Sequence, residues 1–219
     1  MSVAVKGLLS RRTEVELAGV GGQGLALAGI ILAEAAGIYG PNYVMQIEIH
    51  GISTRGGFSR SDVVISPEPI DYPGVLNPNV LLAMNKEELA LFLPRMAEGG
   101  VILAESAMVR ETPPSLPTGV SFYRLPLMQI AREQTGAILA TSIVALGAIG
   151  ALTGVVEADA LEQAVRGRIP AKALDTNLAA MRAGWAAALA AKEGASATLL
   201  QSERNSSGLQ SQRRASPGA

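Results

Sequence analysis

The chain contains no cysteine and only one histidine, His50. The lack of cysteine excludes disulfides, thiolate catalysis and an iron–sulfur cluster ligated by this chain. One histidine also argues against a histidine-based zinc site or an intrachain Ser-His-Asp triad. Because His50 ends an expected strand beside a glycine, we interpret it as a structural or interface residue rather than a general base.

Charged residues are also scarce, at 17% of the 219 residues, and the formal net charge is −1. This balance gives no reason to expect a nucleic-acid ligand. No apolar run reaches the roughly 18 residues of a membrane span without interruption, and Arg11 and Arg12 cut short any secretory signal. We therefore expect a cytoplasmic protein that does not interact with membranes. The apolar content of 48% favours a subunit whose surface is covered by partner proteins.

Strand-like and helix-like segments alternate along the chain, which predicts an α/β, Rossmann-like three-layer domain with a mixed sheet and a helical C-terminal part. The loop before residue 61 is too short for a crossover helix, so the strands on its two sides are expected to be antiparallel neighbours. Asn85 is the expected N-cap of its helix, and Pro94 should disturb that helix's last turn. The expected strands are 13–20, 43–51, 61–66, 79–84, 100–106 and 120–125, and the expected helices are 24–37, 85–98, 126–135, 141–153, 157–167 and 170–192.

The domain is expected to cover residues 13–193, after an N-terminal extension at 1–12. Residues 194–219 are rich in Ser, Gln and Arg and show no periodicity, which predicts a flexible C-terminal tail.

A glycine-rich turn, "GVGGQG", follows the first expected strand. Gly19, Gly21 and Gly24 fit the G-x-G-x-x-G spacing of a phosphate-binding turn, although strand–helix packing alone would also explain them. A nicotinamide site would add an acidic residue about 20 positions later at the end of a strand. Glu48 lies within its expected strand, 24 positions after Gly24, and is weak support. Gln23 could bond a ligand, a neighbouring loop or a partner subunit.

A second glycine element places Arg55, Gly56 and Gly57 in the loop between two strands. An arginine beside two glycines suits a carboxylate, a phosphate or a facing backbone, and a solvated hairpin loop is the simpler alternative. Arg60 and Asp62, just beyond this loop, are expected to form a surface ion pair.

Five segments occur in a fixed order over roughly residues 13–190: "GVGGQG", "AGIILAEAAG", "HGISTRGGFSRSDVVIS", "TSIVALGAIGALTG" and "NLAAMRAGWAAA". Together they resemble the gamma subunit, or gamma-type catalytic domain, of the 2-oxoacid:ferredoxin oxidoreductases. The resemblance implies a complex that oxidatively decarboxylates a 2-oxo acid to its acyl-CoA. It implies alpha- and beta-type subunits with thiamine diphosphate and Mg²⁺, and a ferredoxin-like delta-type subunit with [4Fe-4S] clusters. Electrons would pass to ferredoxin or to an NAD-reducing subunit.

The resemblance also assigns roles within this chain, which is not expected to be active alone. It implies a contribution to coenzyme A binding and to subunit assembly, with no metal ligand and no proton-transfer or nucleophilic residue. The turn that approaches the coenzyme A phosphates would comprise Gly19, Gly21, Gly22, Gln23 and Gly24. The second loop, facing the subunit interface, would comprise Arg55, Gly56 and Gly57.

One departure bears on the substrate. Many pyruvate- and 2-oxoglutarate-type relatives carry glutamate where this chain has Ser53, and "EIHG" is more similar to indolepyruvate oxidoreductases. We therefore expect a bulky or aromatic 2-oxo acid. Two alternatives remain open: a stand-alone NAD(P)-binding oxidoreductase and a purely structural subunit.

Overall fold

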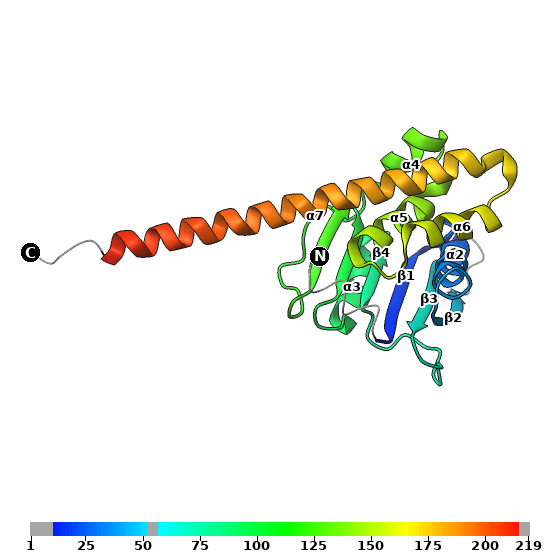
Figure 1. Ribbon diagram of the computed structural model, residues 1–219, viewed down its shortest axis with the longest axis horizontal. Helices are drawn as coiled ribbons and strands as arrows, with labels where there is room; N and C mark the ends of the chain where they lie inside the picture. The colour runs from blue at the N-terminus through cyan, green and yellow to red at the C-terminus, as the bar shows by residue number, and fades with distance from the viewer. Residues whose placement is uncertain (1–10, 52–56, 215–219) are drawn as a thin grey trace, which may run out of the picture.

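A six-stranded mixed sheet forms the centre of the computed structural model, which describes residues 11–51 and 57–214, with side chains up to residue 194 (Figure 1). The strand order is β2-β3-β1-β4-β5-β6, and β3 alone runs antiparallel to its neighbours β1 and β2. The strands are β1 (Thr13–Val20), β2 (Tyr43–His50), β3 (Phe58–Ser66), β4 (Val80–Ala83), β5 (Val101–Glu105) and β6 (Ser121–Leu125). The predicted fold class and the antiparallel pairing of β2 with β3 are confirmed.

Helices follow β1, β4 and β6, and further helices complete the C-terminal part. They are α2 (Leu25–Gly37), α3 (Lys86–Phe92), α4 (Leu127–Thr135), α5 (Thr141–Thr153), α6 (Ala158–Arg168) and α7 (Ala171–Arg214), with short 3₁₀ segments at Leu93–Arg95 and Ile138–Ala140. Asn85 caps α3 as predicted, because its Oδ1 accepts a hydrogen bond from the backbone N–H of Glu88 at 3.1 Å. The expected helix 85–98 ends at Phe92, and the 3₁₀ segment that follows contains Pro94.

The two faces of the sheet are covered differently. Because side chains alternate along a strand, Val15 and Leu17 of β1 point to one face while Glu16 and Ala18 point to the other. The first face carries the larger apolar core, built with α2, α4, α5, α6 and α7. The second face carries a smaller core built with α3 and the segment around Val109 and Val120.

The helices of the first face pack with their backbones in close contact. All 13 residues of α5 are buried. A Cβ added to Gly147 of α5 would lie 2.0 Å from the carbonyl oxygen of Met181 in α7, and one added to Gly184 of α7 would lie 2.0 Å from that of Val144. Trp185 packs against Gly150 of α5 and is therefore a packing residue.

Helix α7 continues to Arg214, where the sequence predicts a helix end near residue 192 (Figure 1). The backbone of the expected tail is therefore helical over most of its length, and its flexibility stays a prediction. No helix in the described part of the chain has the length and apolar character needed to cross a bilayer.

Candidate functional site

The strand order identifies one edge of the sheet as the place for a ligand. Helix α2 leaves the carboxyl end of β1 on the first face and leads to the sheet margin at β2. Helix α3 leaves the neighbouring strand β4 on the second face and leads to β5. The chain thus departs in opposite directions from two adjacent parallel strands, which is the arrangement at which open α/β sheets bind ligands.

The predicted glycine turn lies at this point, between β1 and α2. Gly22 (φ +92°) and Gly24 (φ +75°) both adopt the left-handed conformation that side chains disfavour. Gly22 is exposed, and an added Cβ would meet no atom within 4 Å. Gly24 is the N-cap of α2 and supplies no side-chain acceptor. The turn therefore presents bare backbone to open space on the side of Gly22.

Gln23 helps to shape the turn itself. Its Oε1 accepts a hydrogen bond from the backbone N–H of Val20 at 2.9 Å. A Cβ added to Gly19 would lie 2.2 Å from this Oε1, so Gly19 makes room for the folded-back amide. Gln23 was expected to bond a ligand, a neighbouring loop or a partner subunit, and the observed hydrogen bond lies within its own turn. Ligand binding through its Nε2 stays a prediction.

The two glycine elements meet at this edge of the sheet. The backbone N–H of Gly21 donates to the carbonyl of Gly57 at 2.8 Å. Gly57 directly precedes β3, whose first residues pair with the end of β1. Arg55 and Gly56 lie outside the described residues, and their roles stay predictions.

Ser142, at the start of α5, is a neighbour of the turn that the sequence analysis missed. A Cβ at Gly24 would lie 2.8 Å from Ser142 Oγ, so α2 and α5 approach closely at this point. A buried serine in an apolar helix carries no sequence signal of such a contact.

The position of Glu48 argues against a nicotinamide site. Strand β3 separates β2, which carries Glu48, from β1, which carries the glycine turn. In the usual dinucleotide-binding order the second strand adjoins the first, which brings the acidic residue to the ribose. Glu48 is exposed, and its Oε2 lies 3.4 Å from Nε2 of His50.

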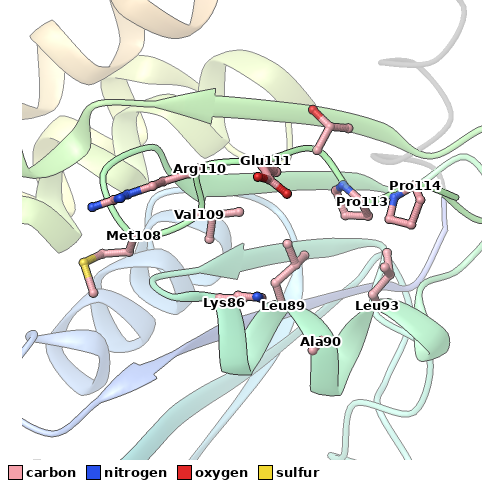
Figure 2. Close-up of a pocket in the computed structure, with 11 residues that line it drawn as sticks. Lys86, Leu89, Ala90, Leu93, Met108, Val109, Arg110, Glu111, Pro113 and Pro114 are labelled. Carbon is pink, nitrogen blue, oxygen red and sulfur yellow. The ribbon is translucent and has the colours of Figure 1, made fainter.

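A cavity of about 440 Å³ opens beside α3, at the carboxyl ends of β4 and β5 (Figure 2). We call it the α3 slot. One wall is α3 with the following 3₁₀ segment, and the other is the proline-containing loop after β5. Its lining residues are Lys86, Leu89, Ala90, Leu93, Met108, Val109, Arg110, Glu111, Thr112, Pro113 and Pro114. Lys86 is the first residue of α3, and Arg110 belongs to the loop after β5. Nothing in the sequence pattern singles out Arg110 for this place.

Arg60 and Asp62 form the expected ion pair, with 3.0 Å between Arg60 Nε and Asp62 Oδ1, but the pair is largely buried and does not lie at the surface. They lie on the second face with Glu16 of β1, and the exposed fractions are 17% for the Arg60 side chain, 2% for Asp62 and 0% for Glu16. Arg60 Nη1 donates to Glu16 Oε1 at 3.2 Å. The predicted pairing is confirmed, but the predicted surface position was wrong, because strand pairing places Asp62 opposite Glu16 beneath a covering segment around Val75.

Burial makes the carboxyl groups of Glu16 and Asp62 weaker acids than usual. Desolvation raises the pKa of Glu16 from 4.5 to about 7, against the opposing effect of Arg60. Desolvation likewise raises the pKa of Asp62. Among the described residues, no group of three or more His, Cys, Asp or Glu side chains is placed to hold a metal ion.

The sequence profile of the pyruvate ferredoxin/flavodoxin oxidoreductase family matches residues 14–187. The chain belongs to this family. It is 37% identical to the 2-oxoglutarate synthase subunit KorC of Methanothermobacter marburgensis, over 79% of this chain and 95% of that protein. It is 28% identical to the indolepyruvate oxidoreductase subunit IorB of Methanothermobacter thermautotrophicus, over 80% of this chain and 96% of that protein.

Solved structures agree with this assignment. The gamma subunit of a keto/oxoacid ferredoxin oxidoreductase from Geobacter sulfurreducens has 37% identity and a TM-score of 0.71, with 82% of this chain and 99% of that chain covered. The 2-oxoglutarate:ferredoxin oxidoreductase from Magnetococcus marinus, solved with 2-oxoglutarate, coenzyme A and succinyl-CoA, has 26% identity and a TM-score of 0.72. The match covers 83% of this chain but only 32% of the Magnetococcus chain. The chain is thus a gamma-type subunit of a 2-oxoacid oxidoreductase and corresponds to one part of a larger enzyme.

Proposed function

We propose that this gamma-type subunit supplies part of the coenzyme A-binding surface of its complex and helps to hold the subunits together. The observation that carries the proposal is the open turn at Gly21–Gly24, which is joined to Gly57 at the switch point of the sheet. Within the described residues, no acceptor is bonded to the backbone N–H of Gly22 or Gly24. A phosphate could approach these groups without meeting a side chain.

The remaining chemistry is assigned to other subunits. This chain has no cysteine for an iron–sulfur cluster and no acidic cluster for a thiamine-bound Mg²⁺ among its described residues. Thiamine diphosphate and Mg²⁺ would belong to alpha- and beta-type subunits, and [4Fe-4S] clusters to a delta-type subunit. Ferredoxin, or an NAD-reducing subunit, would accept the electrons. Such a complex would work in the cytoplasm.

Two observations bear on the identity of the 2-oxo acid substrate, and they favour different classes. Ser53 and the "EIHG" segment favour an aromatic substrate. The identity to KorC, 37%, exceeds the 28% to IorB and favours 2-oxoglutarate. Assaying the assembled complex with 2-oxoglutarate, pyruvate, indolepyruvate and phenylglyoxylate decides between them, because kcat/KM should be highest for one class.

The coenzyme A proposal is tested by placing a negative charge in the turn. Gly22→Asp adds a carboxylate where an added Cβ meets no atom, and asparagine is the uncharged match. Both residues tolerate the left-handed conformation better than other side chains. In the assembled complex, Gly22→Asp should raise the KM for coenzyme A about tenfold above that of Gly22→Asn, a difference of about 1.4 kcal/mol. The KM for the 2-oxo acid should be the same in both variants.

Gly99 offers a second control. It also has a positive φ (+69°) with open space around it, but it precedes β5 at the opposite edge of the sheet. Gly99→Asp should leave the KM for coenzyme A unchanged. Equal values for Gly22→Asp and Gly22→Asn would favour a purely structural subunit. Binding of NAD(P) by the purified chain would favour the stand-alone oxidoreductase.

A further inference from the structure

Strand β2 is one of the two edge strands of the sheet, and within the described part of the chain nothing pairs with its outer side (Figure 1). It spans eight residues, Tyr43–His50, and all of them are in register with β3 on the inner side. A strand pairs through alternate backbone groups on each side, so the outer side of β2 presents a row of N–H and C=O groups. Such a row is a template for a further strand.

The opposite edge strand, β6, is protected in ways that are common for exposed edges. It has only five residues, Ser121–Leu125, and its Arg124 donates to the carbonyl of Arg110 in the loop after β5. Strand β2 is longer and contains no lysine, arginine or proline. Of the two edges of the described sheet, β2 is therefore the one that is open to another strand.

Apolar side chains follow the open edge. The register with β3 places Ile47 opposite Asp62, which lies on the second face, so alternate residues of β2 share that face. These residues form an unbroken apolar row and are Tyr43, Met45, Ile47 and Ile49. Tyr43 is 54% exposed and Met45 is 39% exposed, and the smaller core on this face includes no residue of β2. A half-exposed apolar row beside an open strand edge is typical of an interface.

The apolar row complements itself in an antiparallel pair. Residues directly opposite each other in such a pair lie on the same face, and a twofold axis at Ile47 places Met45 of one copy opposite Ile49 of the other. Ile47 then faces Ile47 of the second copy, so these apolar side chains contact only apolar side chains across the axis. Tyr43 falls opposite Gly51, where an aromatic ring can cover the backbone that glycine leaves bare.

The polar residues of β2 select this register over its neighbours. With the axis at Ile47, Gln46 lies opposite Glu48 of the second copy, and its amide N–H can donate to that carboxylate. An axis at Glu48 would bring two carboxylates together, which is unfavourable. An axis at Gln46 would place the apolar Val44 opposite Glu48 and lose the amide–carboxylate contact. Apolar and polar complementarity together identify a second copy of this chain as the occupant of the edge.

We propose that two copies of this chain associate through β2, antiparallel about a twofold axis at Ile47, so that their sheets join into one continuous sheet. This inference rests on the assembly part of the proposed function, to which it adds a second gamma-type subunit as a partner. It does not depend on coenzyme A. The assembled complex would then contain the gamma-type subunit in an even number.

Cysteine cross-linking tests the pair directly. The chain has no cysteine, so a single introduced cysteine reports which residues meet across the interface. Opposed residues of an antiparallel pair have Cβ atoms about 4.5–5.5 Å apart, close to the separation in a disulfide. Ile47→Cys should therefore give a disulfide-linked dimer on mild oxidation, both in the purified full chain and in the assembled complex. Ser121→Cys, an exposed position on the other edge strand, is the matched control and should stay unlinked.

Charge substitutions test the register without an oxidant. Met45→Lys and Ile49→Glu should each raise the dissociation constant of the dimer about tenfold, because each new charge faces an apolar side chain. A mixture of the two variants should recover much of the affinity, since their new charges face each other in the proposed register. Met45→Leu keeps the apolar contact and should dimerise like the wild type. Analytical ultracentrifugation measures the dissociation constants, and circular dichroism verifies that each variant is folded.

Two outcomes would overturn the proposal. One is a wild-type chain that stays monomeric over a wide range of concentration, with no link at Ile47→Cys in the assembled complex. The other is protection of the β2 amide groups from hydrogen exchange in the complex without that link, which would mean that a different subunit occupies the edge. Either outcome leaves the coenzyme A proposal intact, because the comparison of Gly22→Asp with Gly22→Asn tests it separately. If the other subunits also assemble without this chain, the assembly part of the proposed function is wrong as well.

Discussion

The two faces of the central sheet bury different kinds of side chain. The first face buries apolar side chains under five helices, and α5 is buried along its whole length. The second face buries Glu16, Asp62 and most of Arg60 beneath α3 and a short segment around Val75. The guanidinium carbons of Arg60 and Arg95 each lie over the ring of Phe92 in α3, 5.6 Å from its centre. One face thus depends on close packing and the other on the charge state of a few groups.

This difference means that the two faces should respond to different perturbations. A dry helical layer is sensitive to added volume and insensitive to pH. A buried charge cluster is sensitive to pH, because protonation of a carboxyl group changes the balance between desolvation and ion pairing. The following changes separate these responses.

The largest effect is expected where α5 meets α7. Gly147→Val places a side chain 2.0 Å from the backbone carbonyl of Met181, so the two helices must move apart. We expect a loss of about 3 kcal/mol or more in the free energy of unfolding, with an intermediate loss for Gly147→Ala. Urea unfolding of the purified full chain measures both.

Gly194→Ala is the control, because a Cβ there meets no atom within 4 Å. Alanine in place of glycine in a helix should stabilise the chain by about 0.5–1 kcal/mol. A Gly147→Val variant as stable as wild type would contradict the close contact of the two helices.

The sequence predicted the first face better than the second. The apolar run at 141–153 predicted α5 with its observed bounds, and the glycine turn and the antiparallel β2–β3 pair followed from local patterns. The charge cluster was mistaken for a surface pair, because the position of Glu16 opposite Asp62 depends on which strands become neighbours. The position of Arg110 could not be predicted for the same reason, because only the sheet order brings the loop after β5 beside Lys86.

A second, smaller effect is expected from the pH dependence of Glu16. Its pKa is raised to about 7 in the folded state, from an ordinary value of 4.5. Glu16 therefore contributes stability that is fully present below about pH 4.5 and is lost as the pH rises through 7. Its ionisation should cost about 1–3 kcal/mol after allowance for partial solvent screening.

Glu16→Gln should remove most of this pH dependence. Urea unfolding at pH 5 and pH 8 should show a smaller loss of stability in the variant than in wild type. Some dependence should remain, because Asp62 also has a raised pKa and faces Arg60 and Arg95. Glu98→Gln, an exposed position, should retain the wild-type dependence. The opposite outcome is that the stability of the wild type rises between pH 5 and 8 and that Glu16→Gln shows the same rise. This outcome would show that Glu16 is ionised in the folded chain.

The smallest effect is expected for Glu162 and the two arginines that pair with it on the first face, and it should have the opposite sign. Glu162 of α6 accepts hydrogen bonds from Arg182 at 2.7 Å and from Arg166 at 2.8 Å, which lower its pKa. Its contribution is therefore present above the ordinary carboxyl pKa and is lost as the pH falls through the lowered value. Because solvent screens both ion pairs, Glu162→Gln should change the urea midpoint at pH 7 by little more than the experimental error. The contradicting outcome is a change in stability for Glu162→Gln as large as that for Glu16→Gln, with the opposite pH dependence. It would mean that charged groups stabilise both faces and that burial does not account for the difference between the faces.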